Sequence, residues 1–357
     1  MATTKTRTTV ASAGRDLAAE LGLTLEQLRD MYRLVALARA TDERMWILNR
    51  AGKVPFVISG QGHEGAQVGL CYDLRKDHDW LVPFYRSVAA CITFGMGARD
   101  ILSAQFARGN DISSGGRQMP GHYGAAVHNI LSTSSPVATQ LLHAVGIALA
   151  ARIRGTDQVA LTCLGEGSSN QGDFHEGLNF AGIHQLPVVF VVENNGYAIS
   201  VPMALETAVP DIAMRAPGYN MPGVIVDGAD VLECYRAGRE AIARARMGKG
   251  PTLIEAKVTR LTAHSSDDQQ TKYRSAEELE REKARDPLPR FRAQLLEAGV
   301  LDDEQVAATD AAVRAAVDEA TDWAEAQPEP DPATAMRWVY AEPEPGAGEG
   351  APTGGQA

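Results

Sequence analysis

The chain has 357 residues, enough for one large α/β domain or two small ones. Its hydrophobic content of 45% is ordinary for a globular protein with a full core, and no apolar run reaches the roughly 18 residues that a membrane span needs. The formal net charge of −11 argues against nucleic-acid binding and against binding to an anionic membrane surface.

The first predicted segment, residues 1–24, is a flexible N-terminal stretch. Its first ten residues are rich in threonine, contain Lys5 and Arg7, and have no acidic residue, a bias shared with organelle transit peptides. They lack the apolar stretch of a secretion signal, so a disordered start is the favoured interpretation and organelle targeting is the alternative. We accordingly expect a cytoplasmic protein in a bacterium, or a mitochondrial-matrix protein in a eukaryote.

The first half of the chain predicts helices around one short strand. Apolar residues at helical spacing run from Leu25 to Arg50, and a glycine-punctuated stretch, Gly60 to Gly69, leads into another helix. Trp80 to Phe84 is typical of a short buried strand. Residues 108–131 have weak periodicity and are rich in Gly, Ser, His and Asn, which predicts a functional loop. Residues 134–136, Ser-Ser-Pro, are expected to cap a long helix that ends at Arg152.

The second half alternates strands with helices. The predicted strands are Val159–Leu164, Val188–Val192, Val224–Val226 and Thr252–Val258, and the predicted helices are Phe174–Ile183 and Ala229–Met247. This alternation predicts an α/β fold, a mostly parallel sheet with helices on both faces. A polar loop over residues 260–274 and helices from Ser275 to about Ala324 complete the domain, residues 25–325. The Pro- and Gly-rich tail, residues 326–357, has a composition typical of disorder.

The four cysteines are spaced without metal-type or redox-type pairing, and each lies in an apolar context. We therefore expect reduced thiols inside the core at Cys71, Cys91, Cys163 and Cys234.

Two polar loops follow neighbouring predicted strands. Residues 165–172, Gly-Glu-Gly-Ser-Ser-Asn-Gln-Gly, follow the first central strand, and Glu193-Asn194-Asn195 ends the second. Ligands of open α/β sheets bind at the carboxyl ends of the strands. A carboxylate and an amide oxygen suit Mg²⁺, while glycines and a helix start suit a phosphate. The residues therefore predict a magnesium diphosphate site but do not identify the diphosphate.

Longer motifs carry a resemblance to a known family. The Gly-Glu-Gly and Asn-Asn pieces resemble the thiamine diphosphate motif. Several stretches, from Leu25 to about Tyr340, together resemble the alpha subunit of 2-oxo acid dehydrogenase complexes, most closely the branched-chain member. These stretches are Gly116–Pro120 with His122–Gly124, Ser134–Gln140, Phe174–Ala181, Asn195–Ser200 and His264–Asp268. The resemblance implies the thiamine diphosphate-binding fold.

The resemblance also implies how the cofactor is held. Glu166, Asn195 and the backbone carbonyl of Tyr197 match the family's Mg²⁺ ligands. The cofactor itself would be bound by residues that match the family's Tyr-Arg pair, its glycine loop, a nearby serine and a loop histidine: Tyr85, Arg86, Ser135, Gly165, Gly167, Ser168 and His264. Arginine suits phosphate because its planar fork donates two bonds at once.

His264 is the residue expected to carry catalysis, together with Tyr85. It lies in a polar loop, and an ordinary histidine pKa near neutrality would let it donate or accept a proton at physiological pH. The adjacent Ser265 is where mammalian relatives are phosphorylated. His63, His122 and His128 have no assigned role. Glu193 departs from the arginine that mammalian branched-chain members often carry, so it either turns away from the cofactor or bonds something else.

Residues around the Ser-Ser-Pro stretch match a monovalent-cation site of the branched-chain family. Carbonyl, hydroxyl and amide oxygens from Ser134, Pro136, Thr139 and Gln140 would suit K⁺. The same residues are equally compatible with an ordinary helix cap.

The implied reaction needs partners. Thiamine diphosphate would support decarboxylation of a 2-oxo acid, and the acyl group would pass to the lipoyl group of an acyltransferase component. The family places the carboxylate that activates the cofactor on a separate beta subunit, so we expect an α₂β₂ heterotetramer and no activity in the lone chain. Phe56 and Phe84 are candidate walls of the substrate pocket.

Alternatives remain open for substrate and class. Pyruvate or acetoin could replace branched-chain 2-oxo acids, since apolar pockets discriminate single methylenes by only ~1–3 kcal/mol. A non-catalytic nucleotide-binding module is the alternative of another class. Against it, the first loop lacks G-x-G-x-x-G and the chain lacks GK[ST].

Overall fold

A five-stranded parallel sheet forms the centre of the molecule. The structure is a computed structural model that describes residues 13–337, 339 and 340. The strands are β1 (Trp80–Val82), β2 (Ala160–Gly165), β3 (Val188–Asn194), β6 (Gly223–Asp227) and β7 (Thr252–Lys257). They lie in the order β1-β2-β3-β7-β6, and every pairing in this sheet is parallel. The predicted α/β architecture is therefore confirmed.

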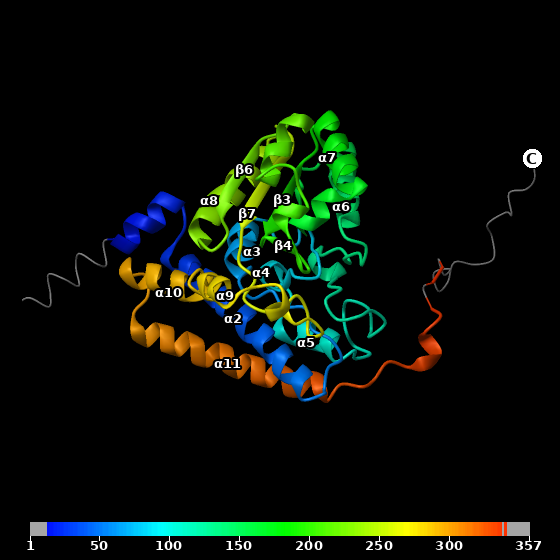
Figure 1. Cartoon of the computed structure of the whole chain (residues 1–357), viewed down its shortest axis with the longest axis vertical. Coiled ribbons are helices and arrows are strands. Elements are labelled where there is room, and N and C mark those ends of the chain that lie inside the picture. Colours follow the sequence, from blue (N-terminus) through cyan, green and yellow to red (C-terminus); the bar gives the residue numbers. More distant parts are fainter. Residues whose placement is uncertain (1–12, 338, 341–357) are drawn as a thin grey trace, which may run out of the picture.

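The two faces of the sheet carry separate hydrophobic cores. Along β3, Val189 and Val191 belong to one core, while Val188, Phe190 and Val192 belong to the other. The strand is buried along its whole length, as expected for a parallel strand covered on both sides. Helices α3 (Glu64–Cys71), α4 (Val88–Phe94) and α8 (Val231–Arg246) cover one face, and α6 (Thr139–Arg154) and α7 (Gly172–His184) cover the other (Figure 1).

Close helix packing on the first face depends on small residues. A Cβ atom on Gly69 of α3 would lie 2.5 Å from the carbonyl oxygen of Val231 at the start of α8. A side chain there would force the two helices apart. The Gly-rich pattern in this part of the chain therefore reflects packing of α3 against α8.

A further layer of helices lies beyond the first core. It contains α2 (Leu25–Arg50), α5 (Ala98–Gln105), α9 (Ala276–Lys283), α10 (Pro287–Glu297) and α11 (Asp303–Glu325). Helix α11 runs along α2 and α5 (Figure 1). Capping boxes start α2 at Thr24 and α11 at Asp302, and Asp286 caps α10 ahead of Pro287, which is favourable at a first turn.

Short elements complete the chain. A two-stranded hairpin, β4 (Tyr197–Ala198) with β5 (Val201–Pro202), follows β3. The 3₁₀ turns are η1 (Ala126–His128), η2 (Glu166–Asn170), η3 (Met203–Leu205), η4 (Ile212–Tyr219), η5 (Gln270–Lys272) and η6 (Pro332–Thr334). Among the described helices, none is long and apolar enough to cross a membrane.

The start of the chain is more ordered than predicted. Residues 13–21, assigned to a flexible segment ending at residue 24, are helical, and Leu21 is buried in the first core. Apolar packing against the domain outweighs the polar composition here. Residues 1–12 and most of the predicted tail lie outside the described residues. In the described part of the tail, the carbonyl of Pro328 accepts a bond from the Gly109 amide.

The predicted helix cap is wrong. Helix α6 begins at Thr139, and its N-cap residue is Ala138, whose φ is 73°. No side chain caps this helix. The Ser-Ser-Pro stretch lies outside the helix, and its oxygens make other contacts, described below.

Candidate functional site

A cavity of about 460 Å³ lies at the carboxyl edge of the sheet. The register explains this position, because Gly165 of β2 is level with Glu193 of β3, and both strands end there. The cavity is lined by Phe56, Phe84, Tyr85, Arg86, Ser134, Ser135, Gly165, Glu166, Gly167, Ser168, Asn195, Tyr197 and His264. Residues predicted from six separate stretches of sequence therefore share one cavity.

Some lining residues were not expected from the sequence. Ile58, Met119, Pro120, Val137, Gln171, Ala198 and Ile199 also line the cavity. His122, left without a role, lines it too, and its Nε2 contacts the hydroxyl of Ser135. Apart from Ile58, these residues lie within the sequence stretches singled out above, but no individual role was predicted for them.

Glu166 is the only carboxylate among the residues that line the cavity. It is 1% exposed, and its Oε2 accepts a bond of 3.2 Å from the Asn195 amide. Its Oε1 has no hydrogen-bond partner within the described chain. Burial raises the pKa of Glu166 to about 7. A divalent cation would stabilise the ionised form and supply the missing partner, so this residue fits the predicted Mg²⁺.

The two asparagines at the end of β3 have different roles. The Oδ1 atom of Asn195 accepts a bond of 3.2 Å from the Tyr197 amide, which shapes the turn at the cavity. Asn194 is buried, and its Nδ2 donates to Oε1 of Glu255 at 2.6 Å. Asn195 is thus available to a metal, whereas Asn194 anchors the turn.

The glycine loop approaches its neighbours closely. A Cβ atom on Gly167 would lie 2.5 Å from the Cβ of Ala198. Only glycine fits here, and its backbone remains accessible from the cavity. Behind the loop, Arg215 donates to the carbonyl of Ser169 at 2.7 Å and to Asn170 at 3.1 Å. Arg215 therefore holds the loop from the side opposite the cavity.

Arg86 and His264 together form a second wall of the cavity. The Arg86 side chain donates to the carbonyl of Ser59 at 2.6 Å and to Nδ1 of His264 at 3.0 Å. Because a guanidinium can only donate, Nδ1 is the acceptor and the proton of the neutral ring lies on Nε2. This geometry makes Nε2 a donor group on the histidine side of the cavity.

The expected near-neutral pKa of His264 is wrong. Burial lowers the pKa to about 4, helped by the positive charges of Arg86 and Arg260. The ring is therefore neutral at physiological pH and acts as a hydrogen-bond donor, not as a group that changes its charge by taking up a proton. Sequence spacing did not reveal the two guanidinium groups packed around it.

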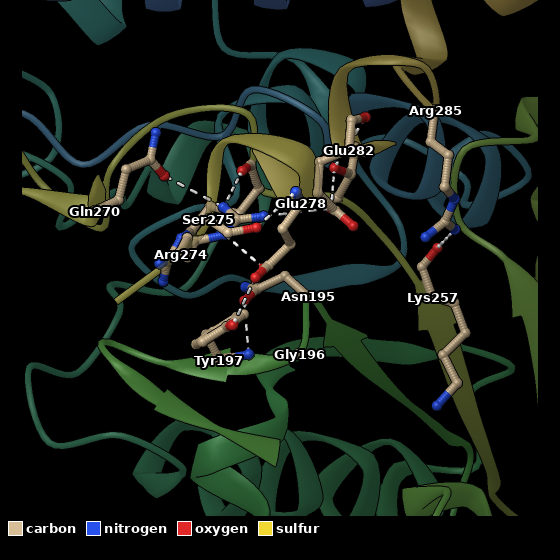
Figure 2. A network of polar contacts seen from close by, with 12 residues as sticks. Asn195, Gly196, Tyr197, Lys257, Gln270, Arg274, Ser275, Glu278, Glu282 and Arg285 are labelled. Carbon is tan, nitrogen blue, oxygen red and sulfur yellow. Dashed lines mark hydrogen bonds and ion pairs between the residues drawn. The ribbon is translucent and has the colours of Figure 1, made fainter. Parts of the chain in front are cut away.

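A polar network links the loop that carries His264 to the turn at Asn195–Tyr197 (Figure 2). The phenol of Tyr197 donates to Glu278 of α9 at 3.1 Å, and Arg274 donates to the same carboxylate at 2.9 Å. Arg274 also donates to the carbonyl of Arg260 at 2.8 Å. Within the loop, Asp268 accepts the His264 amide at 2.8 Å, and the Ser266 amide donates to the Val57 carbonyl outside it at 2.8 Å. The loop is thus attached to the domain at several points.

The open question about Glu193 has a structural answer. Glu193 does not line the cavity and is fully buried. Its Oε2 lies 2.6 Å from Nδ1 of His63 and accepts a bond of 2.8 Å from Gln67. The residue therefore turns away from the predicted cofactor and bonds two side chains near the start of α3.

Oxygen atoms also converge at the predicted monovalent-cation site. The Ser134 hydroxyl lies 2.9 Å from the Pro136 carbonyl and 3.3 Å from Oε1 of Gln140. Gln140 is fixed by its Nε2, which donates to the Cys163 carbonyl at 2.9 Å. Thr139 differs, since its hydroxyl donates to Asp173 at 2.8 Å. Among the described residues, no set of three His, Cys, Asp or Glu side chains is arranged to hold a metal.

Ser265 is buried, and its hydroxyl accepts a bond of 3.3 Å from the Asp267 amide. A kinase could reach this hydroxyl only after the loop opened.

The four cysteines are buried and free, as the sequence predicted.

Together, the parallel sheet, the glycine loop and the acidic site at the strand ends define an α/β protein with a site suited to a metal-bound diphosphate. Residues 32–333 match the family described as "Dehydrogenase E1 component". The chain belongs to this dehydrogenase E1 family, whose members depend on thiamine diphosphate.

Characterised relatives cover nearly the same length. The chain is 53% identical over 321 residues to the 2-oxoisovalerate dehydrogenase subunit alpha of Bacillus subtilis, covering 90% of this chain and 97% of the relative. It is 41% identical over 324 residues to the 3-methyl-2-oxobutanoate dehydrogenase subunit alpha of Mycobacterium tuberculosis, covering 90% and 84%. It is 36% identical over 319 residues to the pyruvate dehydrogenase E1 component subunit alpha of Bacillus subtilis, covering 89% and 83%.

Proposed function

We propose that this chain is the alpha subunit of a branched-chain 2-oxo acid dehydrogenase. The reaction is oxidative decarboxylation of the 2-oxo acid, with transfer of the acyl group to the lipoyl group of an acyltransferase component. The observation that carries the proposal is the convergence of Glu166, Asn195 and Tyr197 with Arg86 and His264 around one cavity. Greater identity to the 2-oxoisovalerate relative than to the pyruvate relative supports the branched-chain substrate.

Glu166, Asn195 and the Tyr197 carbonyl would hold Mg²⁺, and the ion would bind the diphosphate. The orphaned Oε1 of Glu166 and the position of Gly167 in the cavity lining support this assignment. Gly165, Ser168, Ser135, Tyr85 and Arg86 would contact the cofactor from the remaining walls. When bound, thiamine diphosphate supplies the carbanion and the electron sink for decarboxylation.

His264 and Arg86 would act on the reacting end of the site. Neutral His264 presents a donor at Nε2, which can stabilise negative charge that develops on a substrate or cofactor oxygen. Arg86 fixes the histidine ring and adds positive charge next to it. Tyr85 packs against the ring edge, with ring centroids 6.2 Å apart. These contacts pre-organise the donor before the substrate arrives.

The apolar part of the cavity would receive the substrate side chain. Phe56 and Phe84 line it, together with Ile58, Met119 and Val137. Such walls suit a branched aliphatic chain. A pyruvate preference of tenfold or more in kcat/KM over 3-methyl-2-oxobutanoate, measured on the reconstituted complex, would reverse this choice of substrate.

The site would be completed by a beta subunit in an α₂β₂ heterotetramer. Activation of the cofactor needs a carboxylate at the aminopyrimidine ring, and Glu166, the only carboxylate that lines the cavity among the described residues, is assigned to the metal. The purified chain should be inactive alone and active with a beta subunit. Turnover by the lone chain would contradict the split site.

Two smaller assignments belong to the same proposal. Ser134, Pro136 and Gln140 would bind K⁺ through the oxygens that converge there, and Thr139, whose hydroxyl donates to Asp173, would complete the predicted set. The cited relatives come from bacteria, which supports a cytoplasmic location.

The direct test is calorimetry with the full chain and its beta subunit. Thiamine diphosphate should bind in the presence of Mg²⁺ and lose affinity when the metal is chelated, whereas NAD and ATP should not bind. Binding of a nucleotide in place of thiamine diphosphate would favour the nucleotide-binding module instead.

A further inference from the structure

The buried pair His63 and Glu193 has no place in the proposed chemistry. Both side chains are completely buried, and neither lines the cavity. Nδ1 of His63 and Nε2 of Gln67 both bond the same carboxylate oxygen, at 2.6 and 2.8 Å. A buried carboxylate is costly unless it is bonded, so this arrangement has a structural consequence that the sequence did not predict.

Gln67 has a defined orientation. Its Oε1 accepts the backbone amides of Ala89 and Ala90 at 3.0 and 3.2 Å. An amide oxygen facing two N–H donors leaves the nitrogen of Gln67 pointing the other way. That nitrogen donates both to Glu193 and to the backbone carbonyl of Arg86, the latter at 3.0 Å. Every hydrogen-bonding atom of the Gln67 amide is thus used.

These hydrogen bonds connect the end of β3 with the backbone of Arg86 through side chains that do not line the cavity. Glu193 is level with Gly165 on β2 and precedes the Asn194-Asn195 pair, so it belongs to the metal side. Arg86 belongs to the histidine side, because its guanidinium holds His264. A single side chain, Gln67, therefore bridges Glu193 and the Arg86 backbone carbonyl.

We propose that Glu193, His63 and Gln67 form a positioning brace that fixes the backbone at Arg86 relative to the metal-binding turn. The bonded pair Glu193 and His63 holds the Gln67 amide in place, and Gln67 in turn holds the backbone carbonyl of Arg86. The brace rests on the proposed function, since its purpose is to set the distance between the metal and histidine sides of the cofactor site. None of the three residues touches substrate or cofactor.

A double-mutant cycle on the complete α/β complex tests whether the brace acts through Arg86. Glu193→Ala should weaken thiamine diphosphate binding about 10-fold, in line with the roughly 10–100-fold losses typical of groups that orient a metal site. Arg86→Met should weaken it at least as much. The double variant should bind no more than about twofold more weakly than Arg86→Met alone. Losses that multiply would overturn the proposal.

A second readout does not depend on the cofactor. In Glu193→Ala the amides of Ala89 and Ala90 should exchange with deuterium at least tenfold faster, because Gln67 loses its anchor. Unchanged exchange there would also overturn the brace, even if the complex bound no thiamine diphosphate. Failure of the wild-type complex to bind the cofactor, with faster exchange in the variant, would instead count against the proposed function alone.

Matched variants separate the brace from general destabilisation. Asp79→Ala removes another fully buried carboxylate, which bonds Val159 and Arg246 near the start of β1, far along the strands from the cavity. It should lower thermal stability but leave cofactor affinity unchanged. Glu193→Gln, which keeps an oxygen for Gln67, should restore most of the affinity. If Glu193→Ala fails to fold, Gln67→Met cuts the same link to the Arg86 carbonyl while Glu193 keeps its bond to His63.

Discussion

The two walls of the cavity are held in place by different means. On the metal side, Glu166 and Asn195 follow directly from paired parallel strands, and their contacts are bonds to backbone amides. On the histidine side, His264 is held by Arg86, which is 178 positions away in sequence. Strand pairing fixes the first wall cooperatively, whereas separate loop contacts, worth about 1 kcal/mol each, fix the second; they include the Arg86 bond to His264 and a backbone bond from Ser266 to Val57. The histidine side is therefore the half that mutations and ligands should loosen first.

The largest effect should come from the metal side. Glu166→Ala or Asn195→Ala should abolish Mg²⁺-dependent binding of thiamine diphosphate, a loss of more than about 100-fold, because each removes one of few protein oxygens from the ion. Calorimetry on the α/β complex measures this. Glu176→Ala, an exposed residue of α7, serves as the control and should bind normally. Wild-type affinity in both site variants would show that the ligand assignment is wrong.

The next effect should be confined to turnover. His264→Gln should reduce kcat by at least about 100-fold, the lower range for removal of a group that donates to a developing charge. Cofactor affinity should change less than tenfold, because the metal side is intact. Steady-state kinetics and calorimetry together give the split. Equal losses in both quantities would mean that the two walls are not separable.

The sequence predicted the metal side far better than the histidine side. The strands at Val159–Leu164 and Val188–Val192 match β2 and β3 within one or two residues, because buried parallel strands are continuous apolar runs. That placement alone brings Glu166 and Asn195 together. No local pattern connects Glu193 with His63, which are 130 positions apart. Such contacts depend on how α3 packs against the sheet.

The same limit explains the errors. Burial lowers the pKa of His264, and the charges of Arg86 and Arg260 lower it further; of these, only Arg86 was among the predicted site residues. The helix cap failed because Ala138, a residue without any capping group, takes a left-handed conformation. In both cases a tertiary contact overrode a sound local preference. Motif spacing identified the participants in the site, but it did not identify how they are held.

A smaller effect should follow from removing the hydrogen bond between Tyr197 and Glu278 of α9. Tyr197→Phe removes the bond to Glu278 and leaves the backbone carbonyl in place (Figure 2). We expect amides of residues 264–274 to exchange several-fold faster, with cofactor affinity changed less than tenfold, since one neutral donor to a charged acceptor is lost. Glu280→Ala, whose carboxylate pairs only with exposed Lys283 on the same helix, is the control. Unchanged exchange would mean that α9 does not restrain the loop.

The pH dependence of activity should also differ between the side of the cavity that holds His264 and the side that holds Glu166. The pKa of His264 is lowered to about 4, so the ring stays neutral and contributes no limb to the rate profile between about pH 5 and 8. Burial raises the pKa of Glu166 to about 7 when no metal is bound, so protons compete with Mg²⁺ as the pH falls below that value. Activity should therefore decline on the acid side. Tenfold more Mg²⁺ should move that limb to lower pH by at most about one unit. A limb near pH 6.5 that ignores Mg²⁺ and disappears in His264→Gln would place the titrating group on the histidine side instead.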